Sequence, residues 1–414
     1  MTVTSTSAPG PDARPRAGTP AYRRTVIALV AAAVATFAQL WSVQPILPAV
    51  AHGFDTTAAQ AALTVSLATG GMAGFTLVWS GLADRLGRAR VITLSLLLAT
   101  LLGCFAPFAG DLVWLLVLRT LQGAALGGVP AAAVAYLSEE IHPTDVPRAT
   151  GLYIAGNPLG GMGGRLLAGM AAEYGGWQWG VAANTLLGLA ALAVFVLVLP
   201  RPHARASSSR PGAGVGEGMG PRLRSALTTR GLLPLYAQAL LLMGAFMTVY
   251  NLLGFRLMDE PFGLSQAVAS LLFLAYTAGM VGSTAAGSMT VRWGGYTVLT
   301  LAHVLMVASL ASLSAPYLAA VIPALLVLTY AFFSAHATSS AWVGTRAVHG
   351  RTQAMAIYTL CYYLGSSLFG WMGGLVYDAV GWNGSLAFAA ALTTLAGLIA
   401  LRLRRLPGGP ATPP

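Results

Sequence analysis

Long apolar runs separated by short polar stretches make up most of the chain. Twelve of them are each close to the roughly 20 residues that an α-helix needs to cross a bilayer. The pattern therefore predicts an all-α protein with twelve membrane-spanning helices. The first six are expected near residues 24–48, 58–79, 90–108, 112–137, 149–171 and 178–199. The second six are expected near residues 232–255, 265–290, 296–313, 316–343, 353–375 and 382–402.

Three polar stretches flank or separate the two groups of spans. Residues 1–23 are rich in Pro, Ser, Thr, Gly and Arg and lack an apolar face, which predicts a disordered tail and not a signal peptide. Residues 201–230 combine Gly, Pro and Ser with six Arg, which predicts a flexible linker outside the bilayer. Residues 403–414 form a short C-terminal tail. Two six-helix bundles, 24–200 and 231–402, are therefore expected.

The composition agrees with a membrane protein. Of the 414 residues, 56% are hydrophobic and 8% are charged, against about 25% charged residues in soluble domains. The net charge of +11 comes from Arg alone, because the sequence contains no Lys. The Arg residues lie at the ends of apolar runs, which indicates anionic lipid headgroups as partners and not nucleic acid. Cys104 and Cys361 lie in apolar runs without metal-ligand spacing, so neither is expected to bind a metal.

The two halves of the sequence resemble each other. Residues 151–177 align without gaps with residues 356–382. The alignment pairs Tyr153 with Tyr358, Gly160 with Gly365, Gly169 with Gly374 and Trp177 with Trp382. Parallel six-helix repeats are typical of transporters, whose substrate site lies between the repeats near the midplane. A chance match of abundant Gly and aromatic residues is the alternative.

A short Arg-rich turn, LVWSGLADRLGRAR at residues 77–90, joins the second and third predicted spans. It resembles the signature loop of the major facilitator superfamily, a Gly-x-Leu-Ala-Asp-Arg-x-Gly-Arg pattern, with Ser80 in place of the first Gly. The resemblance implies that Asp84 lies near the start of the eleventh helix, around Gln353–Ile357, where a helix N-terminus attracts a carboxylate. Residues 287–294, GSMTVRWG, repeat the turn. The implied conformational gate consists of Gly81, Asp84, Arg85, Gly87 and Arg88.

Two further motifs support this resemblance. Arg119, Gln122 and Gly123 resemble a superfamily motif associated with proton-coupled carriers. The run GNPLGGMGGR, which ends at Arg165, resembles the glycine-proline motif of superfamily antiporters. Together with QPILP at residues 44–48, these motifs are similar to the YnfM-like branch of bacterial inner-membrane efflux carriers. Close helix packing and a hinge are expected at Gly156, Pro158, Gly160 and Gly161.

Polar side chains deep in the spans are the candidates for a coupling site or substrate cavity. No Asp or Glu lies deep in any predicted span, so His303 and His336 are the candidates for a proton relay. Packed, hydrogen-bonding His side chains are the alternative. The coupling or cavity set is Arg119, Gln122, Asn157, Arg165, His303 and His336. The residues that line a cavity, or alternatively join two helices, are Gln39, Gln44, Tyr250, Asn251, Tyr276, Tyr358 and Tyr362.

The two deep Arg residues predict the charge of the substrate. A charge at this depth is costly unless it is paired or faces water. If Arg119 and Arg165 both face the cavity, they share one level without a neutralising carboxylate, and a neutral or anionic substrate is favoured. If Arg165 packs against backbone carbonyls instead, this preference weakens.

The distribution of Arg predicts the orientation. Nearly all Arg residues lie in the tails and in the loops on the side of the two termini, and Arg256 lies on the opposite side. Positively charged loops remain in the cytoplasm. Both termini are therefore expected to be cytoplasmic, in a multi-pass protein of the bacterial inner membrane.

These features predict a carrier that works by alternating access and is not an enzyme. The resemblance implies proton-coupled export of a small organic molecule by a monomer, driven by a proton gradient and without a cofactor or metal. Import of a sugar or organic acid is the alternative. A membrane-embedded enzyme is disfavoured because no span contains paired carboxylates or a metal motif. A receptor is disfavoured because no loop is long enough to form a soluble domain.

Overall fold

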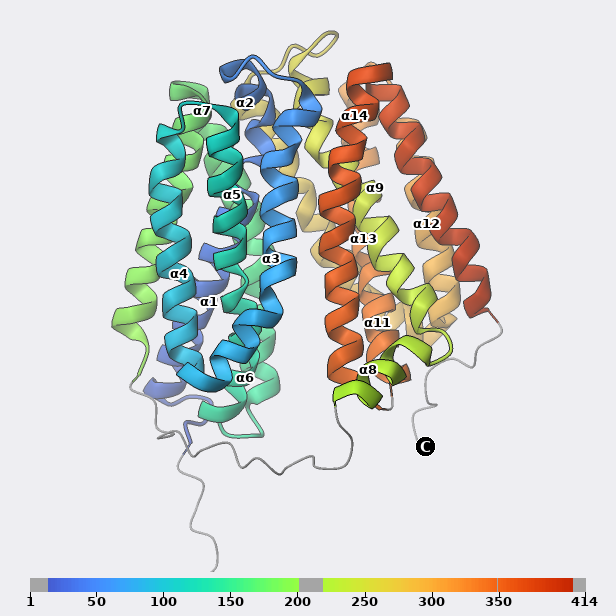
Figure 1. Cartoon of the computed structure of the whole chain (residues 1–414). Helices are drawn as coiled ribbons and strands as arrows, with labels where there is room; N and C mark the ends of the chain where they lie inside the picture. The colour runs from blue at the N-terminus through green and yellow to red at the C-terminus, as the bar shows by residue number, and fades with distance from the viewer. Residues whose placement is uncertain (1–13, 201–218, 348, 405–414) are drawn as a thin grey trace, which may run out of the picture.

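The computed structural model describes residues 14–200, 219–347 and 349–404, and every regular element in these ranges is a helix (Figure 1). The first half contains α1 (Pro20–Trp41), η1 (Gln44–Ile46), α2 (Leu47–Gly53), α3 (Ala58–Leu86), α4 (Arg88–Phe105), η2 (Ala106–Phe108), α5 (Leu112–Leu126), α6 (Gly128–Glu140) and α7 (Val146–Val198). The second contains α8 (Met219–Thr228), α9 (Leu232–Met258), α10 (Gln266–Leu271), η3 (Leu272–Ala275), α11 (Tyr276–Trp293), α12 (Gly295–Ser312), α13 (Leu318–Arg346), α14 (Arg351–Ala400) and η4 (Leu401–Leu403). The predicted all-α class is confirmed.

Ten helical segments in the described ranges are long and apolar enough to cross a membrane. Two of them, Val146–Val198 and Arg351–Leu403, have 53 residues each, about twice the length that a bilayer requires. The first is broken at Gly175 and Gly176, where φ is −144° and +69°, and the second at Gly381, where φ is +73°. Figure 1 shows α14 reversing direction. The arms of α7 and α14 thus correspond to the fifth and sixth and the eleventh and twelfth predicted spans.

The two halves form neighbouring bundles with the same internal packing (Figure 1). In the first half α7 packs along α1, and in the second half α14 packs along α9. The turns after α3 and α11 also agree, because Gly87 and Gly294 end these helices with φ of +89° and +81°. The same contacts therefore recur in both halves, in line with the sequence repeat. Between the halves, α14 packs on α3 and α10 packs on α7.

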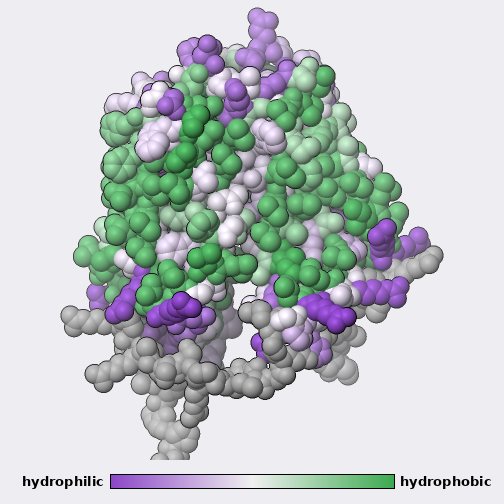
Figure 2. Space-filling model, viewed as in Figure 1, coloured by the Kyte–Doolittle hydropathy of each residue, from purple (hydrophilic) through white to green (hydrophobic). Residues whose placement is uncertain are grey.

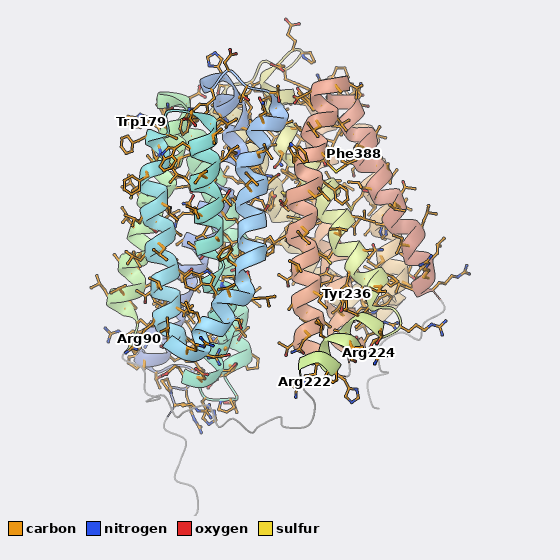
Figure 3. The ribbon with its side chains drawn as sticks, in the orientation of Figure 1. Arg90, Trp179, Arg222, Arg224, Tyr236 and Phe388 are labelled. Atoms are coloured by element: carbon orange, nitrogen blue, oxygen red, sulfur yellow. The ribbon has the colours of Figure 1, made fainter. Side chains whose placement is uncertain are left out.

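The two ends of the bundle differ in charge. Figure 3 shows Arg90, Arg222 and Arg224 at one end and Trp179 near the other. We call the first the basic end; it contains the α3–α4 turn and α8. We call the other the acidic end; it contains α2 and the breaks in α7 and α14. Figure 2 shows the halves in contact at the acidic end and separated at the basic end.

Two polar stretches are more ordered than the sequence predicts. Met219–Thr228, in the predicted flexible linker, forms α8, and Tyr236 of α9 anchors it by donating a hydrogen bond to the Ala226 carbonyl at 2.9 Å. α1 begins at Pro20 and not at residue 24, because the Thr19 side chain caps the helix by accepting from the Tyr22 amide. The rest of the linker up to residue 218, residues 1–13 of the N-terminal tail and residues 405–414 of the C-terminal tail lie outside the described residues.

Candidate functional site

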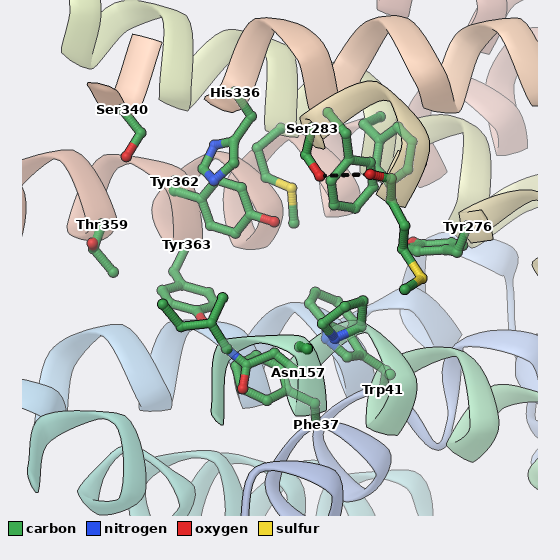
Figure 4. Close-up of a pocket in the computed structure, with 18 of the residues that line it drawn as sticks. Phe37, Trp41, Asn157, Tyr276, Ser283, His336, Ser340, Thr359, Tyr362 and Tyr363 are labelled. Carbon is green, nitrogen blue, oxygen red and sulfur yellow. Dashed lines mark hydrogen bonds between the residues drawn. The ribbon is translucent and has the colours of Figure 1, made fainter. Parts of the chain in front are cut away.

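A cavity of about 540 Å³ lies between the two halves. A volume of this size holds a small organic molecule. Its wall includes the first turns of α7, from Gly151, and of α14, from Met355, so it is reached from the basic end. Helices of both halves supply its side chains, with Trp41 and Asn157 facing His336 and Tyr362 (Figure 4). The cavity therefore lies where a six-plus-six transporter binds its substrate.

The wall is mainly aromatic and apolar. Eight aromatic side chains line it: Phe37, Trp41, Phe246, Tyr276, Phe333, Tyr358, Tyr362 and Tyr363. Four methionines join them: Met243, Met247, Met280 and Met355. Methionine and aromatic side chains together form adaptable surfaces for flat apolar molecules. The described lining contains no Asp or Glu, so Arg165 and His336 are its ionisable side chains apart from tyrosine.

Arg165 is the one guanidinium in the described cavity wall, and it is 1% exposed. Its Nε donates to Gln44 Oε1 at 2.6 Å, and its Nη1 donates to the Gly161 carbonyl at 2.7 Å. The rings of Trp41 and Tyr276 lie 4.7 and 4.6 Å from its central carbon. Aromatic faces stabilise a cation by only about 0.5–2 kcal/mol. Among the residues that the structure describes, the buried charge is therefore held in place without a carboxylate to neutralise it.

A polar chain starts at Arg165 and connects the halves. Gln44 accepts from Arg165 and donates through Nε2 to Asn251 Oδ1 of α9 at 2.7 Å. Gln44 and Asn251 do not line the cavity; they lie behind it, on the side of the acidic end. The predicted residues Gln44, Asn251 and Arg165 thus form one cluster, which joins the cavity wall to the contact between the halves.

Two buried polar atoms in the wall have no hydrogen-bond partner. They are Asn157 Oδ1 on α7 and the Tyr276 hydroxyl on α11. Buried polar atoms in proteins are normally paired, so an orphan is a candidate contact for a ligand. Both atoms belong to residues that the sequence placed at the cavity.

His336 lies in the wall next to Tyr358 and Tyr362. Its Nδ1 is 3.0 Å from the Tyr358 hydroxyl, which donates to the His336 carbonyl at 3.1 Å. Nδ1 is therefore engaged with Tyr358, whereas Nε2 makes no hydrogen bond among the described residues. The ring also packs at 4.7 Å from Tyr362. His336 is therefore a candidate proton acceptor at the cavity.

Arg119 does not line the cavity, in contrast to the two-Arg arrangement considered from the sequence. Its guanidinium is fully buried within the first half and donates to the carbonyls of Gln39, Leu40 and Thr64 at 2.7–3.3 Å. It also donates to Gln122 Oε1 at 2.5 Å, and Gln122 in turn donates to Gln39 Oε1 at 3.2 Å. Arg119, Gln122 and Gln39 thus tie α5 to the last turn of α1.

His303 and Tyr250 are also placed away from the cavity. The two ring nitrogens of His303 contact the Leu299 carbonyl and Gln238 Oε1, within the second half. The Tyr250 hydroxyl bonds to Thr329 Oγ1 at 2.6 Å, and its ring packs against Phe246. Both side chains connect helices, which was the alternative considered for each.

Of the four residues predicted for close packing and a hinge, two pack against α1 and two line the cavity. A Cβ at Gly160 would lie 2.5 Å from the Val34 carbonyl of α1, and one at Gly156 would lie 3.0 Å from Ala33 Cβ. Backbones approach this closely only where no side chain intervenes. Pro158 and Gly161 line the cavity instead.

The predicted gate forms an ion cluster at the basic end. Arg88 Nε lies 2.6 Å from Glu139 Oε1 of α6, and Arg88 Nη2 lies 3.7 Å from Asp84 Oδ1. The Asp84 side chain is 66% exposed and shows no hydrogen bond to the start of α14 in the described part of the chain. Since the halves are separated at this end, the predicted contact with Gln353–Ile357 requires the basic end to close. Gly81 and Arg85 lie in the last turns of α3.

Comparison with known proteins identifies the family. The sequence model of the Major Facilitator Superfamily matches residues 29–370. The chain belongs to the major facilitator superfamily. Such proteins are membrane transporters and not enzymes, and the predicted family is confirmed. The major facilitator fold explains the paired six-helix bundles and the central cavity.

Individual relatives agree with the family assignment. The inner membrane transport protein YnfM of Escherichia coli (strain K12) is 38% identical over 388 residues, covering 94% of this chain and 92% of the relative. The uncharacterized transporter YybF of Bacillus subtilis is 34% identical over 89% of this chain and 90% of the relative. A bacterial homolog of the lysosomal transporter Spinster, in an inward-facing unoccupied conformation, superimposes with a TM-score of 0.73 at 17% identity, covering 93% of both chains. This major facilitator chain is thus a multi-pass membrane transporter.

Two carboxylates at the acidic end have a role that the sequence did not predict. Asp378 Oδ1 and Oδ2 accept from the Ala58 and Ala59 amides of α3, each at 3.1 Å, and Glu173 Oε2 accepts from the Ala267 amide of α10 at 2.9 Å. Each bond joins one half to the other. The signal was present in the repeat, because Glu173 and Asp378 occupy equivalent positions in the aligned segments.

Proposed function

We propose that the protein exports a small organic molecule from the cytoplasm in exchange for protons. It works by alternating access, as a monomer in the bacterial cytoplasmic membrane, with both termini and the basic end in the cytoplasm and anionic headgroups around that end. The observation that carries the proposal is a central cavity that opens to the basic end and is closed at the acidic end. Positive loops remain in the cytoplasm, so in this conformation the cavity exchanges its ligand with the cytoplasm.

The proton-coupled part of the proposal rests on His336. The described cavity wall contains no carboxylate, whereas His336 presents a free Nε2 next to Tyr358 and Tyr362. Imidazole changes its charge near neutral pH. An exchanger needs the proton and the ligand to compete for the same site. Proton uptake at Nε2 of His336 removes this atom as a hydrogen-bond acceptor for the ligand, so the proton and a donor group of the ligand compete there.

Transport in proteoliposomes tests the proposed function. The purified protein is reconstituted with an internal pH dye, and candidate compounds are added with and without a pH gradient. Candidates come from a growth screen of deletion and overexpression strains against toxic compounds and carbon sources. Proton movement opposite to the compound supports exchange. Movement of both in the same direction indicates an importer, and transport without proton movement contradicts coupling.

His336→Gln is expected to reduce substrate-driven proton movement at least tenfold, because the amide cannot take up the proton. Ligand binding should remain, since Gln preserves a polar side chain of similar size. His303→Gln is the matched control, because His303 lies outside the cavity, and its proton movement should stay within twofold of the wild type. Equal proton movement in His336→Gln and the wild type would show that another group carries the proton.

A further inference from the structure

We propose that the cavity binds an organic anion with a flat aromatic or similar apolar body, whose carboxylate contacts Arg165. This inference rests on the proposed function in taking the cavity as the substrate site. It goes further by assigning the ligand's charge, its body and the residue that binds the charge.

The charge follows from the environment of Arg165. Its Nε and Nη1 donate to Gln44 and to the Gly161 carbonyl, and the Tyr276 side chain contacts the guanidinium, so the groups that contact it among the described residues are all neutral. A cation at this burial, without an anion nearby, keeps a large part of its desolvation cost. A carboxylate gains a charge-assisted bond here and offsets that cost. A cationic ligand would add a second uncompensated charge.

The shape of the ligand follows from the aromatic side chains of the cavity wall. The rings of Trp41 and Tyr276 lie against the guanidinium, and Phe37 and Phe246 line the neighbouring surface. Flat apolar molecules pack well between such rings. The unpaired Asn157 Oδ1 and Tyr276 hydroxyl provide one acceptor and one donor for polar substituents on the ligand.

Three probes with the same ring system and different charges test the assignment. They are 1-naphthaleneacetate, its neutral amide and 2-(1-naphthyl)ethylamine, titrated calorimetrically into the purified protein in detergent. We expect the acetate to bind at least tenfold more tightly than the amide and the amine to bind weakest. Equal affinities, tightest binding of the amine, or no binding of any probe would overturn the proposal.

Variants then identify the group that binds the carboxylate. Arg165→Gln should remove the preference for the acetate while amide binding changes less than threefold, and Arg165→Lys should keep the order at reduced affinity. Arg256→Gln, which removes a charge at the acidic end, is the control and should change nothing. An unchanged preference in Arg165→Gln would overturn the assignment. If Arg165→Gln fails to fold, Arg165→Lys decides the assignment, and an unchanged affinity for the acetate in that variant would overturn it. Binding without transport would contradict only the proposed function.

A separate observation supports a second inference, about how the acidic end is held closed. We infer that Glu173 and Asp378 form two equivalent latches, each bonding a carboxylate of one half to the start of a membrane-spanning segment of the other. Asp378 bonds to the first residues of Ala58–Leu86, and Glu173 bonds near the start of Gln266–Trp293. A carboxylate at a helix N-terminus is stabilised by the free amides and the helix dipole.

The glycines one turn before the latches let the halves meet there. A Cβ at Gly374 would lie 2.6 Å from Ala59 Cα, and one at Gly169 would overlap the Ser270 side chain. The sequence repeat pairs these two glycines. Each half therefore supplies the same device, a glycine for close contact and a carboxylate four residues later. Opening the acidic end breaks both latches.

Distances between spin labels at the acidic end test the latches. Labels are placed at His52→Cys and Asn383→Cys, which are exposed residues on different halves, after Cys104 and Cys361 have been replaced by serine. Glu173→Ala and Asp378→Ala should each shift the ratio of closed to open molecules by about two- to thirtyfold toward the longer distance, and the double variant should shift it further.

Asp111→Ala is the matched control for the latches. Asp111 also lies at the acidic end and caps a helix, but it accepts from the Trp114 amide of its own half at 2.7 Å. Its loss should leave the distance distribution unchanged. An unchanged distribution in the double variant, or an equal shift in Asp111→Ala, would overturn the inference. Thermal unfolding of each variant verifies that the fold is intact.

Discussion

Arg119→Leu is expected to destabilise the protein by about 3–5 kcal/mol, as the loss of one member of a buried charged network typically does. The substitution removes the donor to the Gln39 and Leu40 carbonyls in the last turn of α1, and to Gln122. Leucine supplies no hydrogen bond in return. Thermal unfolding in detergent, followed by tryptophan fluorescence, measures the loss.

Arg256→Leu provides the comparison for Arg119. Arg256 lies near the surface at the acidic end, donates to the Glu260 carbonyl and packs on Phe262. Surface interactions of this kind contribute about 1 kcal/mol or less. If Arg119→Leu instead unfolds like the wild type and loses affinity for anions, then Arg119 faces the cavity and not the interior of the first half.

Gly160→Ala and Gly365→Ala are each expected to destabilise the protein by about 1–3 kcal/mol, because an added methyl group has no space. Gly160 faces the Val34 carbonyl of α1, and Gly365 faces the Leu240 carbonyl of α9. Backbone atoms cannot move aside as a flexible side chain can. The equivalent positions in the two halves should therefore give similar losses.

Gly163, on the same helix as Gly160, is the control for these substitutions. A Cβ at Gly163 would meet no atom within 4 Å, so Gly163→Ala should be neutral or slightly stabilising through helix propensity. Unfolding temperatures of the three variants are compared in one detergent. A loss in Gly163→Ala as large as that in Gly160→Ala would show that reduced backbone flexibility, and not the close contact, is responsible.

Span positions and the repeat could be predicted because both are local properties of the sequence. Run length sets the number of crossings, and the pattern from Tyr153 to Trp177 recurs from Tyr358 to Trp382. The helix α8 was missed because the Gly, Pro and Ser residues before it dominate the composition of the linker. The breaks at Gly175–Gly176 and Gly381 replace the predicted gaps between spans, since a glycine with positive φ reverses the chain within one or two residues.

Which deep polar side chain faces the cavity could not be predicted in the same way. Arg119 and Arg165 lie at similar depth in equally apolar helices, and burial alone does not give the direction of a side chain. The structure separates them through their surroundings. Arg119 donates to carbonyls of α1 and α3 and to Gln122 inside the first half, whereas Arg165 donates to Gln44 and the Gly161 carbonyl and lies in the cavity wall. The contacts of Glu173 and Asp378 depend on how the halves are placed, and no local pattern encodes that.

The breaks in α7 and α14 also determine how the chain can enter the membrane during synthesis. Residues on either side of Gly176 belong to two antiparallel spans with no polar loop between them. If one arm crossed the bilayer alone, the other arm would remain in water as an apolar helix. The two arms must therefore insert together as a hairpin, and the same holds for the arms that meet at Gly381. Translocation of each short turn at the acidic end is thus coupled to the insertion of both of its arms.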